Sequence, residues 1–174
     1  MLPNVHERQL HARADQVGAL LDGLSGPKDS LWPRSHWPPM RLDRPLGVGA
    51  RGGHGGIRYS VEEYRPGERV VFRIAERGGL SEGLEGTHRL EIEPVDGNRT
   101  ILRHVIDARC RGMMRLKWPL VIEPLHDALL EDALDRAAVA VGDRPHNVGY
   151  SAWVRLLRAI FRRLRRSPER YAAT

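Results

Sequence analysis

Residues 122–141 read IEPLHDALLEDALDRAAVAV, the longest uninterrupted helical pattern in the chain. Apolar residues recur along it at three- and four-residue spacing, which predicts one buried face. Pro124 suits a first helical turn, where its missing N–H is not needed, and Gly142 suits a helix end. The pattern therefore predicts a helix over 122–141 whose apolar face lies against another layer of the structure.

The acidic residues of this helix lie on its other side. Asp127, Glu131 and Asp135 follow one another at four-residue spacing, and we expect them to form a ridge in solvent. The C-terminal half of the apolar face is made largely of alanine, and small side chains leave space between a helix and a sheet. What fills that space is the functional question.

The composition is that of an ordinary globular protein, with 41% hydrophobic and 29% charged residues in a chain of 174. No apolar run approaches the roughly 20 residues that span a bilayer, and the first residues, MLPNVHERQL, lack the hydrophobic stretch of a signal peptide. The single cysteine, Cys110, excludes an internal disulfide and an all-cysteine metal site. We therefore expect a cytoplasmic protein.

The formal net charge of +6 is confined to the C-terminal end of the chain. From Asp143 onward there are eight arginines and two acidic residues, whereas residues 1–142 hold equal numbers of basic and acidic groups. Any attraction to a polyanion therefore belongs to the tail. We expect a ligand-binding domain over 1–142, followed by a linker and a tail helix over 143–174.

The clearest hairpin reads IRYSVEEY (57–64), RPGE and RVVFRIA (69–75). Apolar residues alternate with polar ones on both arms, and Pro66-Gly67 supplies the turn chemistry. Further elements are expected elsewhere: strands over 4–11, 40–50, 87–93 and 100–110, a short helix over 15–24, a sharp turn or bulged edge in RGGHGG (51–56), and a mobile glycine-rich segment over 77–86.

This order places an antiparallel meander before the long helix, so the predicted class is α+β. A sheet with one apolar face must bury it, and the helix over 122–141 is the only element long enough to lie across it. We expect a curved antiparallel sheet wrapped around that helix, with a cavity between the two.

Three segments carry a resemblance to a known superfamily: SVEEYRPGERVVFRI (60–74), GTHRLEIEPVDGNRTILRHV (86–105) and RGMMRLKWPLVIEPLHDALLEDALDR (111–136). Over residues 4–142 the chain resembles the SRPBCC or START-like superfamily, which includes the Bet v 1-like and polyketide cyclase/dehydrase-like helix-grip proteins. The resemblance implies a deep, mostly apolar cavity for a lipid, polyketide or similar ligand, and no fixed catalytic set.

The expected ligand contacts are the inward positions of the strands, the start of the long helix and the segment before it. They are Tyr59, Val61, Phe72, His88, Leu90, His104, Ile106, Met114, Trp118, Leu125, Leu129 and Ala133. With these contacts the protein would bind or transport a hydrophobic small molecule.

The alternative is an enzyme of the cyclase/dehydratase kind. His88 and His104 share the alternation face of apolar neighbours, so either imidazole could act as general acid or base, with Tyr59 as a hydrogen-bond donor. The opposing interpretation is that both are core histidines bound to backbone or water. The sequence leaves open whether the protein is an enzyme.

No cofactor and no metal are expected. Glu123, His126 and Asp127 gather at the start of the long helix, but their spacing matches no metal motif such as HExxH. Adjacent helical residues also point to different faces. For Cys110, flanked by two arginines, we expect a packed thiol in place of a nucleophile.

The tail segment SAWVRLLRAIFRRLRR (151–166) predicts a basic amphipathic helix. It would dock on its own domain or on a second subunit, or lie on an anionic membrane at the inner face. Binding to nucleic acid is disfavoured, because the body adds no net charge that would extend a basic surface.

Overall fold

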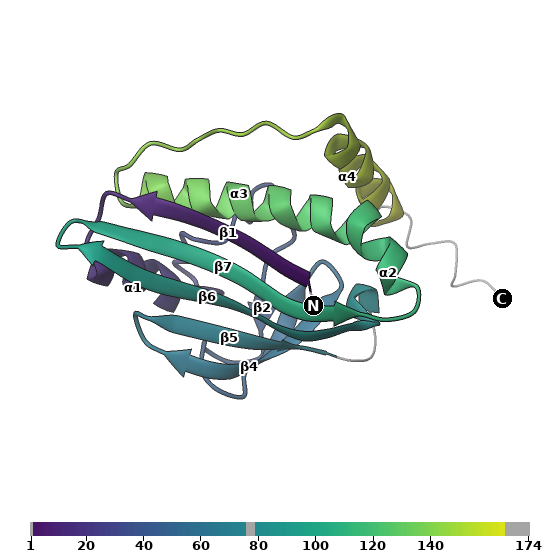
Figure 1. The fold of residues 1–174 in the computed structure, drawn as a ribbon, viewed down its shortest axis with the longest axis horizontal. Coiled ribbons are helices and arrows are strands. Elements are labelled where there is room, and N and C mark those ends of the chain that lie inside the picture. The colour runs from purple at the N-terminus through teal and green to yellow at the C-terminus, as the bar shows by residue number, and fades with distance from the viewer. Residues whose placement is uncertain (1, 76–78, 166–174) are drawn as a thin grey trace.

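The computed structural model describes residues 2–75 and 79–165. Within this part, seven strands form one antiparallel sheet in the order β1-β7-β6-β5-β4-β3-β2, and α3 lies across it (Figure 1). The strands are β1 (Leu2–Leu10), β2 (Arg41–Leu42), β3 (Arg51–His54), β4 (Ile57–Arg65), β5 (Arg69–Ile74), β6 (Leu84–Asp96) and β7 (Arg99–Cys110). The helices are α1 (Ala14–Asp22), η1 (Gly79–Ser81), α2 (Met114–Lys117), η2 (Trp118–Ile122), α3 (Glu123–Ala140) and α4 (Ala152–Arg165).

The predicted α+β class and helix-grip arrangement are confirmed. The hairpin β4–β5 has its turn at Gly67, whose positive φ of 72° is a conformation that glycine adopts without strain. Its inward side chains supply the centre of the core, where Phe72 and Val70 are fully buried. Burying such a side chain contributes about 1.5–3 kcal/mol.

The glycine-rich stretch 51–56 was predicted as a sharp turn or a bulged edge, and its first four residues form the strand β3. β3 pairs with β4 on one side and with the two-residue β2 on the other. Side chains at Gly52 and Gly53 would collide with the carbonyl oxygens of Arg41 and Ile57, so glycine permits this close pairing. The prediction of one strand over 40–50 was therefore wrong.

The glycine-rich segment 77–86 lies partly within the described residues. Of these positions, 79–81 form η1 and 84–86 begin β6, while 77 and 78 lie outside the described part.

The long helix begins earlier than predicted. α2, η2 and α3 run on from one another over 114–140, and η2 is a π-helical turn between two α-helical segments. Pro124 lacks the N–H that would bond to the Leu120 carbonyl in a regular α-helix. That carbonyl instead accepts a hydrogen bond from Trp153 Nε1 of α4, at 2.8 Å. The helix ends before Gly142, whose φ is 80°.

The acidic ridge of α3 was predicted to lie in solvent, and that prediction was wrong. The strand β1 lies along the ridge and partly covers it. Arg8 of β1 donates to Asp135 at 2.7 Å and to Glu131 at 2.9 Å. His6 contacts Asp127 and Glu131 from the same strand. These pairs bind α3 to the edge of the sheet.

The tail helix α4 docks on α3 in this structure, with Val154 and Leu157 buried. α4 and α2 lie at the same end of the molecule, opposite the β6–β7 turn (Figure 1). Residues 166–174 of the predicted tail lie outside the described part. Among the described helices, none is both long enough and apolar enough to cross a bilayer.

Candidate functional site

A cavity of about 410 Å³ lies between the sheet and α3. Its lining is mostly apolar and comes from the sheet, α3, the segment 31–40 and α4. Of the expected ligand contacts, the structure places nine in this lining: Phe72, His88, Leu90, His104, Ile106, Trp118, Leu125, Leu129 and Ala133.

Three expected contacts lie elsewhere. Tyr59, Val61 and Met114 are buried but are not among the lining residues. Tyr59 packs edge-on against Phe72 and His88, with ring centroids 5.0 and 4.9 Å apart. Met114 belongs to a separate core cluster below η2. The alternation of apolar and polar residues therefore identifies which side chains point inward. It does not show whether such a side chain lines the cavity or packs in the core.

Two parts of the cavity wall were not predicted from the sequence. The segment 31–40, predicted as a loop, contributes Trp32, Trp37 and Met40, and α4 contributes Phe161. The two tryptophans within a proline-rich stretch were the available signal, because large aromatic side chains in a loop need a surface to cover.

Four histidines line the cavity in a row from β3 to α3: His54, His88, His104 and His126. The Nε2 atom of His104 lies 3.3 Å from Nδ1 of His88, a long hydrogen bond in which one ring donates and the other accepts. The ring centroids of His104 and His126 are 5.0 Å apart. Phe72 stacks on His88 at 4.8 Å with an interplanar angle of 15°.

These imidazoles are held in the neutral form. Burial, with a smaller effect from the neighbouring imidazoles, lowers the pKa of His54 and of His88 to about 3. Burial likewise brings the pKa of His104 well below its ordinary value. A neutral imidazole can donate or accept a hydrogen bond without placing a charge in the cavity.

Two ring nitrogens at one end of this row, Nδ1 of His104 and Nε1 of Trp118, have no hydrogen-bond partner among the described residues. The ring of His126 is a neighbour of both, with its centroid 5.0 Å from that of His104 and 6.3 Å from that of Trp118, but its Nδ1 faces Asp127 at 3.6 Å. Buried polar atoms are nearly always paired, so two unpaired nitrogens in one corner indicate a place for a polar group from outside the chain.

No protein-family model and no curated protein matches the chain. Solved structures do match it. A protein of Thermobifida fusca, solved by NMR, superposes with a TM-score of 0.62 at 16% identity, over 85% of this chain and 100% of that one. The fold is the helix-grip fold.

Two further structures have the same helix-grip architecture. Norcoclaurine synthase from Thalictrum flavum, in complex with dopamine and hydroxybenzaldehyde, gives a TM-score of 0.59 at 16% identity and covers 85% of this chain and 90% of its own. CalU16 from Micromonospora echinospora gives 0.56 at 15% identity, over 91% of this chain and 83% of its own. At these identities the likeness establishes the fold alone, in agreement with the Bet v 1-like resemblance.

Within residues 2–75 and 79–165, one group brings possible metal-ligand atoms together: His6, His126 and Asp127, all within 4.8 Å of one another. The cluster is already ion-paired. His6 Nε2 lies 3.0 Å from Asp127 and its Nδ1 lies 3.2 Å from Glu131, so both ring nitrogens face carboxylates. That geometry fits a doubly protonated imidazolium, which has no lone pair for a metal.

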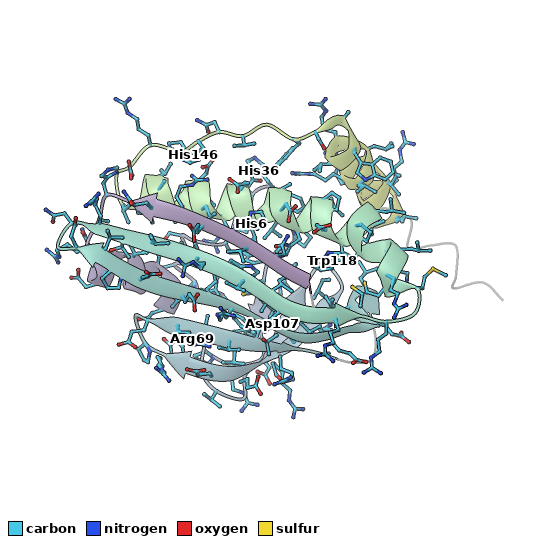
Figure 2. The ribbon with its side chains drawn as sticks, in the orientation of Figure 1. His6, His36, Arg69, Asp107, Trp118 and His146 are labelled. Carbon is cyan, nitrogen blue, oxygen red and sulfur yellow. The ribbon has the colours of Figure 1, made fainter. Side chains whose placement is uncertain are left out.

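The pKa values in this cluster agree with an ion pair. The hydrogen bond to Asp127 raises the pKa of His6 despite the opposing effect of burial. Burial opposes ionisation of Asp127, but the imidazoles of His126 and His6 and the amide of Asn4 outweigh it and lower its pKa. We interpret the cluster as an anchor between β1 and α3; Figure 2 shows His6 on β1 beside that helix.

A second polar arrangement attaches α4 beside the cavity. Asp132 of α3 accepts a hydrogen bond from Trp37 Nε1 at 2.6 Å and another from the Tyr150 hydroxyl. The guanidinium of Arg158 lies 4.3 Å from the Trp37 ring centroid and 4.2 Å from that of Tyr150. It also donates to the His36 carbonyl at 2.8 Å. We call Trp37, Asp132, Tyr150 and Arg158 the latch.

Cys110, the single cysteine, is half-buried at the end of β7. Burial raises the pKa of its thiol, so the reactive thiolate is disfavoured. It is not among the residues that line the cavity.

Proposed function

We propose that this protein binds a hydrophobic small molecule that carries one polar end, such as a carbonyl or hydroxyl group. The cavity volume of about 410 Å³ falls in the range of roughly 300–1,000 Å³ typical of ligand sites. The ligand's apolar body would contact Leu90, Leu129 and Ala133. Its polar end would face the unpaired nitrogens of His104 and Trp118.

The observation that carries this proposal is the corner of unpaired nitrogens in an otherwise apolar wall. Trp118 offers an N–H donor, and each neutral histidine can donate or accept. A polar group that meets such a site gains hydrogen bonds that the empty protein lacks. A molecule without that group leaves buried polar atoms unsatisfied, which costs about 1–3 kcal/mol each.

The first test is to fill the cavity. Ala133 lies in the lining, and Ala133→Phe should reduce binding of the neutral fluorescent dye Nile red at least tenfold, because the new ring occupies ligand space. Ala140→Phe is the matched control, since Ala140 is exposed on the same helix and should leave binding unchanged. Equal dye binding by the two variants would contradict the proposal. Native mass spectrometry of freshly purified protein would identify the bound molecule.

A cyclase-like enzyme is the second candidate, favoured by the contact between His88 and His104. A neutral imidazole held by a second one can accept a proton and pass it on. If the co-purified molecule is converted on incubation, and His104→Gln stops conversion while binding persists, the protein is an enzyme. Binding without conversion favours a carrier.

A further inference from the structure

Large apolar side chains are exposed at one end of the molecule. Among the described residues, seven such side chains occur on the stretch around α2 and η2 and on α4: Met113, Leu116, Leu120, Trp153, Leu156, Ile160 and Leu164. The most exposed, Leu164 and Met113, are 67% and 64% accessible. Trp153 joins the two groups through its bond to the Leu120 carbonyl. We call these seven side chains the apolar ridge.

The charged residues in the two segments that carry the ridge are all basic, since residues 111–122 and 144–165 contain no acidic residue. Glu85 of β6 lies beside the first segment and pairs with Arg111 at 2.7 Å. Exposed cations stand on both segments: Arg115, Lys117, Arg155, Arg162 and Arg163. The outer face of the sheet, in contrast, carries charges of both signs, as in Arg103 with Glu7 and Glu93.

The cavity opens beside this ridge. Of the residues that line the cavity in the described part, the exposed ones are Ser35, His36, Pro39 and Arg162. The first three belong to one loop and the fourth to α4, so the mouth lies between that loop and α4. Phe161, next to Arg162, lines the cavity too, whereas Ile160 is exposed on the ridge.

We propose that the apolar ridge and its cations dock on an anionic lipid bilayer, with the cavity mouth at the membrane surface. Apolar side chains would enter the interface between headgroups and acyl chains while the cations contact lipid phosphates. Each cation near an anionic surface strengthens binding about fivefold. The inference that a ligand enters the cavity from the bilayer rests on the proposed function, whereas the docking itself does not.

Charge complementarity favours a membrane over a second copy of the chain or a nucleic acid as the partner of this surface. In a twofold dimer the same patch would face itself, and the two ridge segments would set cations against cations, since neither segment contains an acidic residue. A nucleic acid would satisfy the cations but would leave the seven apolar side chains against a charged backbone. A bilayer with anionic headgroups satisfies both.

The test is sedimentation of the full chain with vesicles of phosphatidylcholine, with and without phosphatidylglycerol. We expect clear binding only to the anionic vesicles. Leu156→Glu with Ile160→Glu should weaken it at least tenfold, because two ridge side chains become charged. Val95→Glu is the control, since Val95 is 43% exposed in the β6–β7 region at the other end.

The charge contribution is tested separately. Arg115→Gln with Lys117→Gln should weaken binding to anionic vesicles about 25-fold, from about fivefold for each cation. Lys28→Gln with Arg99→Gln removes the same charge from exposed positions elsewhere and should have little effect. Circular dichroism of each variant establishes that it remains folded, and Leu156→Gln, a milder change, should still weaken binding measurably.

Several outcomes would overturn the docking proposal: no binding to anionic vesicles, equal loss in the control variants, or concentration-dependent dimerisation that the ridge variants abolish. Binding to RNA in preference to vesicles would do the same. Ala133→Phe should bind vesicles normally. Failure of dye binding with vesicle binding retained would therefore count against the proposed function alone, and the reverse against docking alone.

Discussion

The two longest helices of this protein are held in place by different means. α3 is fixed to β1 by buried charge, since Arg8 is 5% exposed and bonds to both Glu131 and Asp135. α4 is fixed by the buried side chains of Val154 and Leu157 and by the latch, where one cation contacts the nearly perpendicular rings of Trp37 and Tyr150 at the rim of the cavity. The first attachment belongs to the core of the fold, whereas the second can open without separating any strands. We therefore expect α3 to respond to global unfolding and α4 to open locally.

Acid should have the largest effect, and it should act on the interface of α3 with the sheet. Histidines with a lowered folded pKa stay neutral in the fold but take up protons once unfolded below about pH 6.5. Their stabilising effect is therefore present above that pH and is lost as the pH falls. Each contributes a slope of about 1.4 kcal/mol per pH unit in this range.

The raised pKa of His6 works in the opposite direction. Its contribution is present at low pH and is lost as the pH rises through its folded pKa. In the described part, burial lowers the pKa of several histidines, whereas a raised pKa is found for His6. The free energy of unfolding should therefore still fall in acid. Urea unfolding at pH 7.5, 6 and 5 measures the slope. His104→Leu should make it shallower, and a flat profile would contradict the neutral row.

The next largest effect should come from Arg8→Ala, which removes the partner of two carboxylates. Breaking a buried ion pair typically costs about 3 kcal/mol, since the remaining charges stay desolvated. Chemical denaturation should show this as a lower midpoint with an unchanged slope.

Arg44→Ala is the matched control for Arg8→Ala. Arg44 pairs with Asp43 in solvent, with both side chains substantially exposed, and should give no measurable change. Equal losses in the two variants would mean that α3 does not depend on the pairs with β1.

The difference between these attachments also explains what the sequence could predict. The hairpin β4–β5 and the helix over 122–141 follow from local periodicity, and both are confirmed. The pairing of Arg8 with Glu131 joins residues 123 positions apart. Spacing along one segment carries no information about such a partner, so the acidic ridge was interpreted as solvated.

In the cavity, too, local periodicity predicted some features and contacts between distant segments could not be predicted. Alternation identified His88 and His104 as inward side chains, and they line the cavity side by side. It could not separate them from Tyr59, which faces the same way but is covered by its neighbours. The contributions of 31–40 and α4 depend on how an irregular segment folds back over the sheet, which no periodic pattern encodes.

The smallest and most local effect should follow Arg158→Met, which keeps the apolar stem of the side chain and removes its cation. A cation over an aromatic ring contributes about 0.5–2 kcal/mol, so amide hydrogen exchange in α4 should accelerate several-fold. Exchange in α3 should be unchanged, because its contacts with β1 remain. Arg155→Met is the control, since the Arg155 side chain is exposed and its one hydrogen bond to a described residue goes to the Tyr150 backbone carbonyl.

The same variant tests whether the latch controls the cavity. The mouth lies between α4 and the loop that carries His36, so faster opening of α4 should increase the association rate of Nile red while changing its equilibrium affinity little. If exchange in α3 and α4 rose together, the two helices would open as one unit and the distinction between them would fail. If the association rate stayed constant while α4 alone opened, the ligand would enter by another route.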